Sequence, residues 1–374
     1  MEFGIIVQSP VFRWDSENDP AAEHRSLMND IEYVEAADRA GFKYCWATEH
    51  HFLEEYSHLS ANDVFLAYLA HSTKRIHLGS GIFNPLPQVN HPAKVAEKVA
   101  MLDQLSEGRF EFGSGRGAGT HEILGFLPEM RDLTHTREIW EDVIREFAKM
   151  WTQDEYEGYQ GQYWSLPPRK ILPKPWKKPH PAMWYAAGNS SSWEMAARYG
   201  LGILGFSVTS LDQLAAVIDS YKDNIDKAEP VGAFVNDNIM VVGLGAALSE
   251  ESAKAVAARF EKPAYFTSLL YRYHDTFPRP EGIPAWPEIV AAREPVPEVL
   301  RASVEAMNPD NVLEMCRQWE AAGVDQLVFS PNMLTREEAL ESIALLGKHV
   351  IAKLDTDPVH RTDRFREAAV AATA

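Results

Sequence analysis

Residues 91–117, HPAKVAEKVAMLDQLSEGRFEFGSGRG, form one complete unit of the predicted fold. Apolar residues recur at helical spacing over residues 91–105 and predict a helix with a single buried stripe. Residues 109–113 are short and largely apolar, which predicts a buried strand, and a glycine-rich loop over residues 113–117 follows. A helix, a buried strand and a loop in this order are typical of parallel α/β folds.

The same alternation continues in both directions from this unit and gives eight strand-like segments in all. The strands are nearly all apolar, as expected where both faces of a parallel sheet are buried. Right-handed crossovers between such strands predict an α/β fold, a (β/α)8 TIM barrel, with an open doubly wound sheet as the alternative. The predicted strands are residues 2–8, 44–47, 75–79, 109–113, 183–187, 201–207, 238–247 and 326–330.

Local signals mark the ends of several predicted helices. Gly41 is predicted to end a helix over residues 22–40, because glycine accepts the left-handed conformation common after a last helical turn. Thr335 and Glu338 fit a capping box that begins the final helix of the barrel. These signals place helix ends between the predicted strands.

Two stretches and the C-terminal segment interrupt the alternation. Residues 152–180 and 262–296 are rich in proline and aromatic residues and follow neither period, so insertions into the barrel are predicted there. The residues after Leu354 are polar and then small, which predicts a polar C-terminal arm on the surface over about 355–374. The whole chain, 1–374, is predicted to be a single barrel domain.

Composition limits the classes of function. The chain has 374 residues, 45% of them hydrophobic, and a formal net charge of −18 without a basic stripe, so nucleic acid is not an expected partner. No apolar run is long enough for a transmembrane helix, and the first residues resemble a strand rather than a signal peptide. Cys45 and Cys316 lie in apolar segments and are predicted to be buried free thiols. A cytoplasmic protein is expected.

Glu49, His50 and His51 directly follow the second predicted strand. Chemistry in a barrel of this kind sits at the carboxyl ends of the strands. An imidazole titrates near neutral pH, so these histidines suit general acid–base catalysis. Hydrogen-bonded loop residues and metal ligands are the alternatives. A metal site would need further ligands, and the sequence shows no HExxH or His-x-His pattern, so no metal is predicted.

Two other strand ends suit a phosphate group. Arg116 lies among glycines after the fourth strand, where backbone amides and a guanidinium can approach an anion together. Gly188, Asn189 and three serines follow the fifth strand and begin a helix, whose free amides favour anions. No GxGxxG follows a strand and no Walker pattern is present. The two loops together predict a phosphorylated ligand.

These residues resemble the bacterial-luciferase-like flavin monooxygenase superfamily. The most specific segments are Glu49-His50-His51-Phe52 and the run from His91 to Phe110, which is similar to a stretch of the luciferase α-subunit. The resemblance runs from residue 1 to about residue 210, and the order of barrel elements is kept to about residue 352.

The resemblance implies a TIM barrel that binds FMN at its C-terminal face. It implies that His50 acts on the flavin–oxygen adduct, and we expect Glu49 to orient it. It also implies a cis peptide between Gly81 and Ile82 under the flavin. We expect an apolar wall of Trp46, Phe83 and Phe206 around the cofactor. The cofactor-binding residues expected on this basis are Arg116, Gly117, Ala118, Gly188, Asn189, Ser190, Ser191, Ser192, Gly81, Ile82 and Phe206.

The sequence departs from the luciferase subunit at four positions in these loops. Gly115 replaces its reactive cysteine, so no thiol chemistry is expected. Gly188 replaces a carboxylate and Asn189 a serine at the phosphate loop. Phe206 replaces a tryptophan and keeps the wall apolar. Light emission and an aldehyde substrate therefore do not carry over.

The expected activity is that of a two-component FMNH2-dependent monooxygenase, which uses molecular oxygen through a C4a-peroxyflavin to oxygenate a small or medium organic substrate. A separate NAD(P)H:flavin reductase and a homodimer are the expected partners. An F420-dependent hydride-transfer enzyme is one alternative, with Lys174, Lys177 and Lys178 as cations for its anionic tail. A non-catalytic flavin-binding protein and a metal-dependent hydrolase that uses His50 and His51 are the others.

Overall fold

Eight parallel strands form a closed barrel in the computed structural model, which describes residues 1–373 apart from 118, 206–210, 260 and 273–296. The predicted (β/α)8 barrel is confirmed, and the strands begin and end within a few residues of their predicted bounds. The strands are β1 (Glu2–Val7), β2 (Tyr44–Ala47), β3 (His77–Ser80), β4 (Phe110–Ser114), β7 (Ala182–Ala187), β8 (Gly202–Gly205), β9 (Ile239–Leu244) and β10 (Gln326–Phe329). Around the barrel they follow the order β1-β10-β9-β8-β7-β4-β3-β2.

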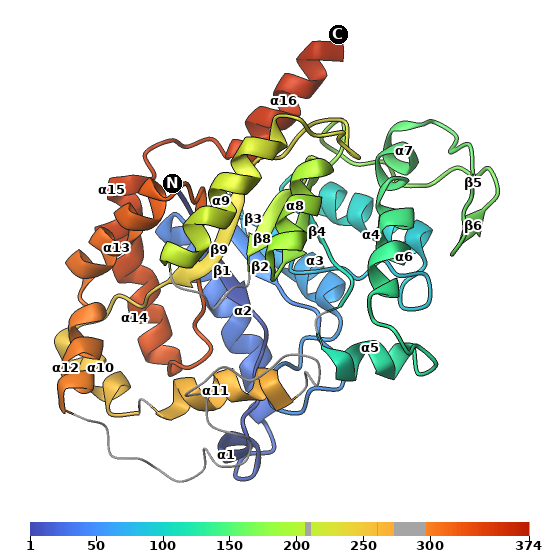
Figure 1. Ribbon diagram of the computed structural model, residues 1–374. Helices are drawn as coiled ribbons and strands as arrows, with labels where there is room; N and C mark the ends of the chain where they lie inside the picture. The colour runs from blue at the N-terminus through green and yellow to red at the C-terminus, as the bar shows by residue number, and fades with distance from the viewer. Residues whose placement is uncertain (118, 206–210, 260, 273–296, 374) are drawn as a thin grey trace.

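Helices surround the barrel and cover its outer face (Figure 1). Their buried stripes pack on the apolar outer side chains of the strands, which form the main hydrophobic core. The helices are α1 (Arg13–Ser16), α2 (Ala22–Ala40), α3 (Asn62–Ser72), α4 (Pro92–Leu105), α5 (Thr120–Phe126), α6 (His135–Ile144), α7 (Phe147–Thr152), α8 (Ser190–Arg198), α9 (Leu211–Ile225), α10 (Glu250–Ala257), α11 (Glu261–Arg272), α12 (Pro297–Ala306), α13 (Pro309–Ala321), α14 (Arg336–Leu346), the π-helical turn η2 (Gly347–Ile351), α15 (Ala352–Leu354) and α16 (Arg361–Thr373).

The predicted helix ends are present. Gly41 ends α2 with a φ of 95°, a conformation that favours glycine. The Thr335 side chain accepts from the Glu338 amide, and the Glu338 carboxylate accepts from the Thr335 amide, so the predicted capping box begins α14.

Two tryptophans fill the inside of the barrel. Trp46 and Trp184 are fully buried with ring centroids 5.1 Å apart. Glycines make room for them, because a Cβ atom on Gly79 would lie 2.3 Å from the Trp46 ring and one on Gly202 would lie 2.6 Å from Trp184. Two large rings opposite two glycines thus share the barrel interior with medium-sized side chains such as Leu204, Met240 and Val328.

The two predicted insertions differ from expectation in one respect. Residues 152–180 are irregular apart from a two-stranded hairpin of β5 (Tyr159–Gln160) and β6 (Ser165–Leu166). The second insertion was predicted to begin at residue 262, but α11 continues to Arg272, because its apolar residues pack beside the barrel mouth. Residues 273–296 lie outside the described part of the chain.

The C-terminal segment does not form the predicted surface arm over its whole length. It crosses the amino-terminal end of the barrel and buries Thr362 and Arg366. Thr362 donates to Glu111 of β4, and Arg366 donates to Asp103 and to the Gly108 carbonyl oxygen. These polar side chains are buried because charged groups at the barrel base pair with them. Only the far end of α16 projects away from the barrel (Figure 1).

Candidate active site

The carboxyl ends of the strands open toward α1, α5 and α11, at the end of the molecule opposite to both chain termini (Figure 1). His50, which follows β2, lies here. Its Nδ1 atom is 3.2 Å from Oε1 and 3.3 Å from Oε2 of Glu122, a buried residue in the first turn of α5. Glu122 could not be predicted from the sequence, because nothing in its surroundings marks it as a partner of a histidine 72 residues earlier.

Glu49 was predicted to orient His50, and this prediction is wrong. Glu49 instead lies 3.3 Å from Nε2 of His51. In an extended segment, neighbouring side chains point to opposite sides and residues two apart share a side. Glu49 therefore faces His51, and the orientation of His50 falls to Glu122.

The Glu122 carboxylate holds the loop after β2 through contacts with two of its residues. Its Oε1 also accepts from the His51 backbone amide at 2.8 Å. Burial alone would raise the pKa of Glu122, but the neighbouring His50 and these hydrogen bonds lower that pKa below its ordinary value. An ionised Glu122 can accept a hydrogen bond from a protonated Nδ1 of His50, which leaves the other ring nitrogen, Nε2, available for proton exchange.

Aromatic rings form one side of this region. The Tyr56 ring lies 5.1 Å from that of His50, and Phe266 of α11 stacks on Tyr56 at 5.2 Å. Phe12 and Trp14 continue the wall, since Phe12 contacts Phe266 edge-on at 6.2 Å. An apolar wall beside a histidine limits the access of water to it.

The predicted phosphate loops follow β4 and β7, which are neighbours in the barrel. Arg116 is half-buried, and its Nη1 donates to Thr136 at 2.9 Å, which fixes the guanidinium on α6. Asn189 begins α8, where its Oδ1 accepts from the Ser192 amide and from the hydroxyls of Ser191 and Ser192. Gly188, Asn189, Ser190 and Ser191 are exposed. Helix-start amides near a fixed cation suit an anionic group.

The loop after β3 shows the predicted cis peptide between Gly81 and Ile82. Asn62 of α3 donates to the carbonyl oxygens of Ala47 and Ile82 and so joins the ends of β2 and β3. A Cβ atom on Gly115 would lie 3.1 Å from the Ile82 side chain, so the glycine leaves space where the luciferase subunit has cysteine.

The described residues fit a flavin at this end. Thr48 Oγ1 is buried at the end of β2 without a hydrogen-bond partner in the described part of the chain. An unpaired buried hydroxyl is typical of a site that a ligand completes. Nothing within 4 Å would meet a Cβ atom on Gly188, so the loop after β7 leaves open space there.

Several expected residues lie elsewhere. Ala118 and Phe206 are outside the described residues. Trp46 does not form the mouth wall, because it fills the barrel interior and donates to Gln326. Phe83 points outward and stacks on Phe110 at 6.1 Å.

The three lysines proposed for an F420 tail lie before β7, at the amino-terminal end of the barrel. There Lys174 donates to the Met150 carbonyl oxygen, Lys178 donates to that of Pro175, and Lys177 pairs with Asp363 of α16. They cannot serve a ligand at the opposite end of the strands.

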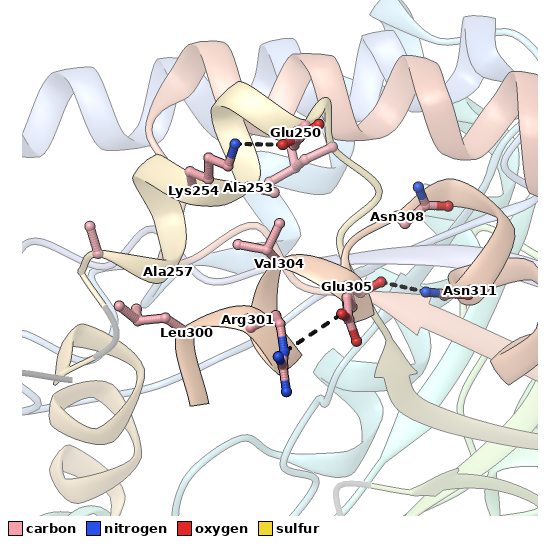
Figure 2. A pocket seen from close by; sticks show the side chains of 12 residues that line it. Glu250, Ala253, Lys254, Ala257, Leu300, Arg301, Val304, Glu305, Asn308 and Asn311 are labelled. Carbon is pink, nitrogen blue, oxygen red and sulfur yellow. Dashed lines mark hydrogen bonds and ion pairs between the residues drawn. The ribbon is translucent and has the colours of Figure 1, made fainter. Parts of the chain in front are cut away.

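A hollow of about 620 Å³ lies away from the strand ends, between α10 and α12. Figure 2 shows Ala257, Leu300 and Val304 along it, with the charged residues paired among themselves, Lys254 with Glu250 and Arg301 with Glu305. It shares no residue with the loops that carry His50, Arg116 or Gly188. We therefore do not assign the active site to it.

The family described as luciferase-like monooxygenase matches residues 1–326. The chain belongs to this family. The predicted identity as an enzyme of the luciferase-like monooxygenase type is thereby confirmed.

Relatives of this luciferase-like chain include two kinds of enzyme. The oxygenase component of a flavin-dependent trigonelline monooxygenase from Acinetobacter baylyi is 28% identical over 314 residues, which cover 80% of this chain and 81% of that protein. An F420-dependent glucose-6-phosphate dehydrogenase from Amycolatopsis mediterranei is 25% identical over 340 residues, which cover 87% and 98%.

Solved structures of luciferase-like enzymes share the fold. The oxygenating constituent of 3,6-diketocamphane monooxygenase from Pseudomonas putida, solved in complex with FMN, superposes with a TM-score of 0.69 at 20% identity. The match covers 94% of this chain and 98% of that one. Among the described residues, no helix combines the length and the apolar character that a membrane span requires.

Proposed function

We propose that this chain is the oxygenase component of a two-component FMNH2-dependent monooxygenase that oxygenates a small or medium organic substrate. The observation that carries the proposal is the pairing of His50 with the buried Glu122 on the same barrel end as the Arg116 and Gly188–Ser192 loops. In this proposal His50 and the two loops that suit an anion lie at the same end of the barrel. This arrangement is expected of an enzyme that uses a phosphate-bearing cofactor.

Each group has a separate task in this proposal. FMNH2 supplies the electrons that activate oxygen. Arg116 and the first amides of α8 hold the phosphate, and Gly115 leaves space for the ring system to approach β4. His50, oriented by Glu122, holds or moves a proton at its Nε2 atom. Tyr56 and Phe266 exclude water from that histidine.

Three further expectations belong to this proposal. A separate NAD(P)H:flavin reductase supplies FMNH2, in keeping with the relative that is itself an oxygenase component. The chain acts as a homodimer. It works in the cytoplasm, in keeping with Cys45 and Cys316, which are buried free thiols.

The test is stopped-flow mixing of the protein, loaded anaerobically with FMNH2, against oxygenated buffer. We expect the absorbance of oxidised FMN to return more slowly than in a protein-free control, with a separate absorbing species before it. Reoxidation at the protein-free rate, with quantitative release of hydrogen peroxide, would sink the proposal.

An F420-dependent dehydrogenase is the second candidate, because such a relative aligns over most of this chain. Reduced and oxidised F420 should then bind at the same barrel end, and bleaching of oxidised F420 by a substrate should proceed without oxygen. Tight binding of F420 together with no binding of FMNH2 would replace the first proposal with this one.

A further inference from the structure

His77, which begins β3 at the base of the barrel, lies between two carboxylates. Its Nδ1 atom is 2.8 Å from Oε1 of Glu111 on β4, and its Nε2 atom is 3.6 Å from Oδ2 of Asp363, in the first turn of α16. The side chains of His77 and Glu111 are only 3% and 2% exposed. An ionised carboxylate only accepts hydrogen bonds, so this arrangement suits an imidazolium that carries a proton on each ring nitrogen.

The charges around His77 favour this protonated form. Burial alone would lower the pKa of His77, but Asp363 and Glu111 raise that pKa above its ordinary value of 6.5. Burial alone would raise the pKa of Asp363, but His77 and Lys177 lower it, so the carboxylate on α16 is ionised at neutral pH. The protonated imidazole and the Lys177 ammonium, which pairs with Asp363, then balance the two carboxylates.

Two aromatic neighbours of His77 remain uncharged near neutral pH. The His360 ring stacks on the His77 ring with centroids 3.7 Å apart at 10°, and burial lowers the pKa of His360 to about 2. Tyr44 meets the two imidazoles edge-on at 5.8 Å and 5.4 Å, and burial raises the pKa of its hydroxyl well above the ordinary value. Neither ring competes with His77 for the proton. The charged groups beside these rings are already paired with one another: Lys43, Glu2 and Asp355.

The two nitrogens of His77 differ in what they hold. The Nδ1 proton makes a short hydrogen bond to Glu111, whereas Nε2 lies beyond hydrogen-bonding range of Asp363 and meets it as an ion pair. Glu111 is fixed to the barrel, since its Oε2 also accepts from Nε1 of Trp184 at 2.8 Å. Asp363 belongs to α16. Loss of the Nε2 proton therefore removes the attraction of His77 to α16 and keeps its hydrogen bond to the barrel.

We propose that a proton on Nε2 of His77 holds α16 to the base of the barrel, and that α16 opens more readily as the pH rises above neutral. Opening, the separation of α16 from the barrel, carries Asp363 away, so His77 binds its proton more tightly while α16 is docked. The stability that depends on this proton is therefore present in full below about pH 6.5 and is lost as the pH rises through the titration of His77. This contact lies away from the candidate active site and does not depend on the proposed function.

The test is hydrogen exchange of the α16 amides in the full chain between about pH 6 and pH 9, with each rate divided by that of an unstructured peptide at the same pH. We expect the opening equilibrium of α16 to rise above about pH 6.5, by at most about tenfold per pH unit, while that of α14 does not follow this rise. Asp363→Asn should remove most of the rise, because an amide carries no charge. An opening of α16 that is independent of pH in the unsubstituted chain, or an equal rise in α14, overturns the proposal.

The matched control is Asp357→Asn, which removes an exposed carboxylate that pairs with Arg364 of α16. It should change the opening of α16 by the same factor at every pH. An NMR titration of the His77 imidazole in the unsubstituted chain needs no folded variant, and we expect it to titrate above pH 6.5. A pKa of His77 at or below 6.5, or a rise with pH that Asp363→Asn retains, overturns the proposal as well.

Discussion

At the scale of single residues, the pairing of His50 with Glu122 is central to the proposed chemistry. Glu122 is a positioning residue, because it contacts the imidazole and the His51 amide but follows no strand end itself. A lowered pKa keeps it ionised at neutral pH, so the carboxylate can hold one tautomer of His50. Loss of the charge should therefore affect the proton chemistry more than the binding of the cofactor.

His50→Ala should leave FMNH2 affinity nearly unchanged and lower product formation by about 10²–10⁴-fold, the usual contribution of a general acid or base. Glu122→Gln should lower product formation less than His50→Ala does, and it should shift the pH profile of product formation. Product and hydrogen peroxide should be measured together, and peroxide should replace the lost product. An unchanged pH profile in Glu122→Gln would reduce Glu122 to a structural role.

Arg116→Ala should weaken FMNH2 binding by about 1.5–3 kcal/mol, the range for a hydrogen bond to a charged group. Riboflavin, which lacks the phosphate, should bind the variant and the unsubstituted chain equally well. Anaerobic titration of both ligands provides the comparison. If the affinity for riboflavin falls as far as that for FMNH2, the assignment of Arg116 to the phosphate is wrong.

Residue types near strand ends could be predicted from the sequence, but their partners could not. His50, Arg116 and Asn189 lie at strand ends because the alternation of elements puts them there. Glu122 belongs to the site through a helix, α5, whose direction depends on packing. Hydrophobic periodicity within a segment carries no signal for such contacts between distant residues.

At the scale of elements, the fit of β2 against β3 depends on one small residue. Gly79→Ala would place a Cβ atom 2.3 Å from the Trp46 ring, which is held by Gln326. We expect a loss of about 1–3 kcal/mol or more in unfolding free energy, as for an overpacked core. Trp46→Leu in the same chain should recover part of that loss in urea unfolding.

Gly245→Ala is the control for this substitution, because its Cβ atom would meet only the Met315 methyl group at 3.8 Å. Its unfolding free energy should stay close to that of the unsubstituted chain. Equal losses at both positions would mean that the tight space around Trp46 is not the cause.

His180, in the turn before β7, should make the free energy of unfolding depend on pH. Burial lowers the pKa of His180 to about 4, and Nε2 accepts from the Ala233 amide at 2.8 Å while Nδ1 donates to the Pro181 carbonyl oxygen. The unfolded chain binds a proton below about pH 6.5 and the folded chain does not, so stability falls as the pH drops from there to about 4. The contribution of this histidine should fall by about 2 kcal/mol between pH 7 and pH 5.

His180→Asn provides the comparison, since an amide can donate and accept without titrating. The variant should be less stable than the unsubstituted chain at pH 7, and the difference should narrow by pH 5 in urea unfolding. A constant difference across this range would contradict the assignment of a low pKa to His180.

The ends of elements could be predicted where a local signal exists, as at Gly41 and Thr335. They were harder to predict where contacts with distant segments determine the path of the chain. The segment after Leu354 is polar, which suggested solvent, yet Arg366 is buried by partners that come from Asp103, Gly108 and Lys177. Polarity in the sequence does not distinguish a solvated arm from a segment with buried charged partners.

At the scale of the whole molecule, α16 ties together segments from the beginning, middle and end of the chain. Arg361 pairs with Asp325 and Asp237, and its amide donates to Glu2. Arg366 contacts Asp103, and the two side chains are 2% and 0% exposed. The base of the barrel is thus closed by ionic contacts rather than by an apolar plug.

Arg366→Met should lower the unfolding free energy by about 3–5 kcal/mol, because it leaves the Asp103 carboxylate buried without its cation. Asp103→Asn in the same chain should recover part of this loss. FMNH2 binding at the other end should stay unchanged while the protein is folded. Urea unfolding of Arg366→Met, Asp103→Asn and the double variant provides the comparison. No recovery in the double variant would mean that the pair is not coupled.

The closing segment also bears on how this protein is made. Residues 360–366 leave the ribosome after all eight strands, and synthesis proceeds at about 5–20 residues per second. Until then Asp103 and Glu111 lack the partners from α16 that seal the base, so the nascent barrel presents charged groups to water for about 2–7 seconds after its last strand is made. A growing chain with an open, hydrated base is less prone to aggregate than one with an exposed apolar core, and it becomes fully stable only when its final helix emerges.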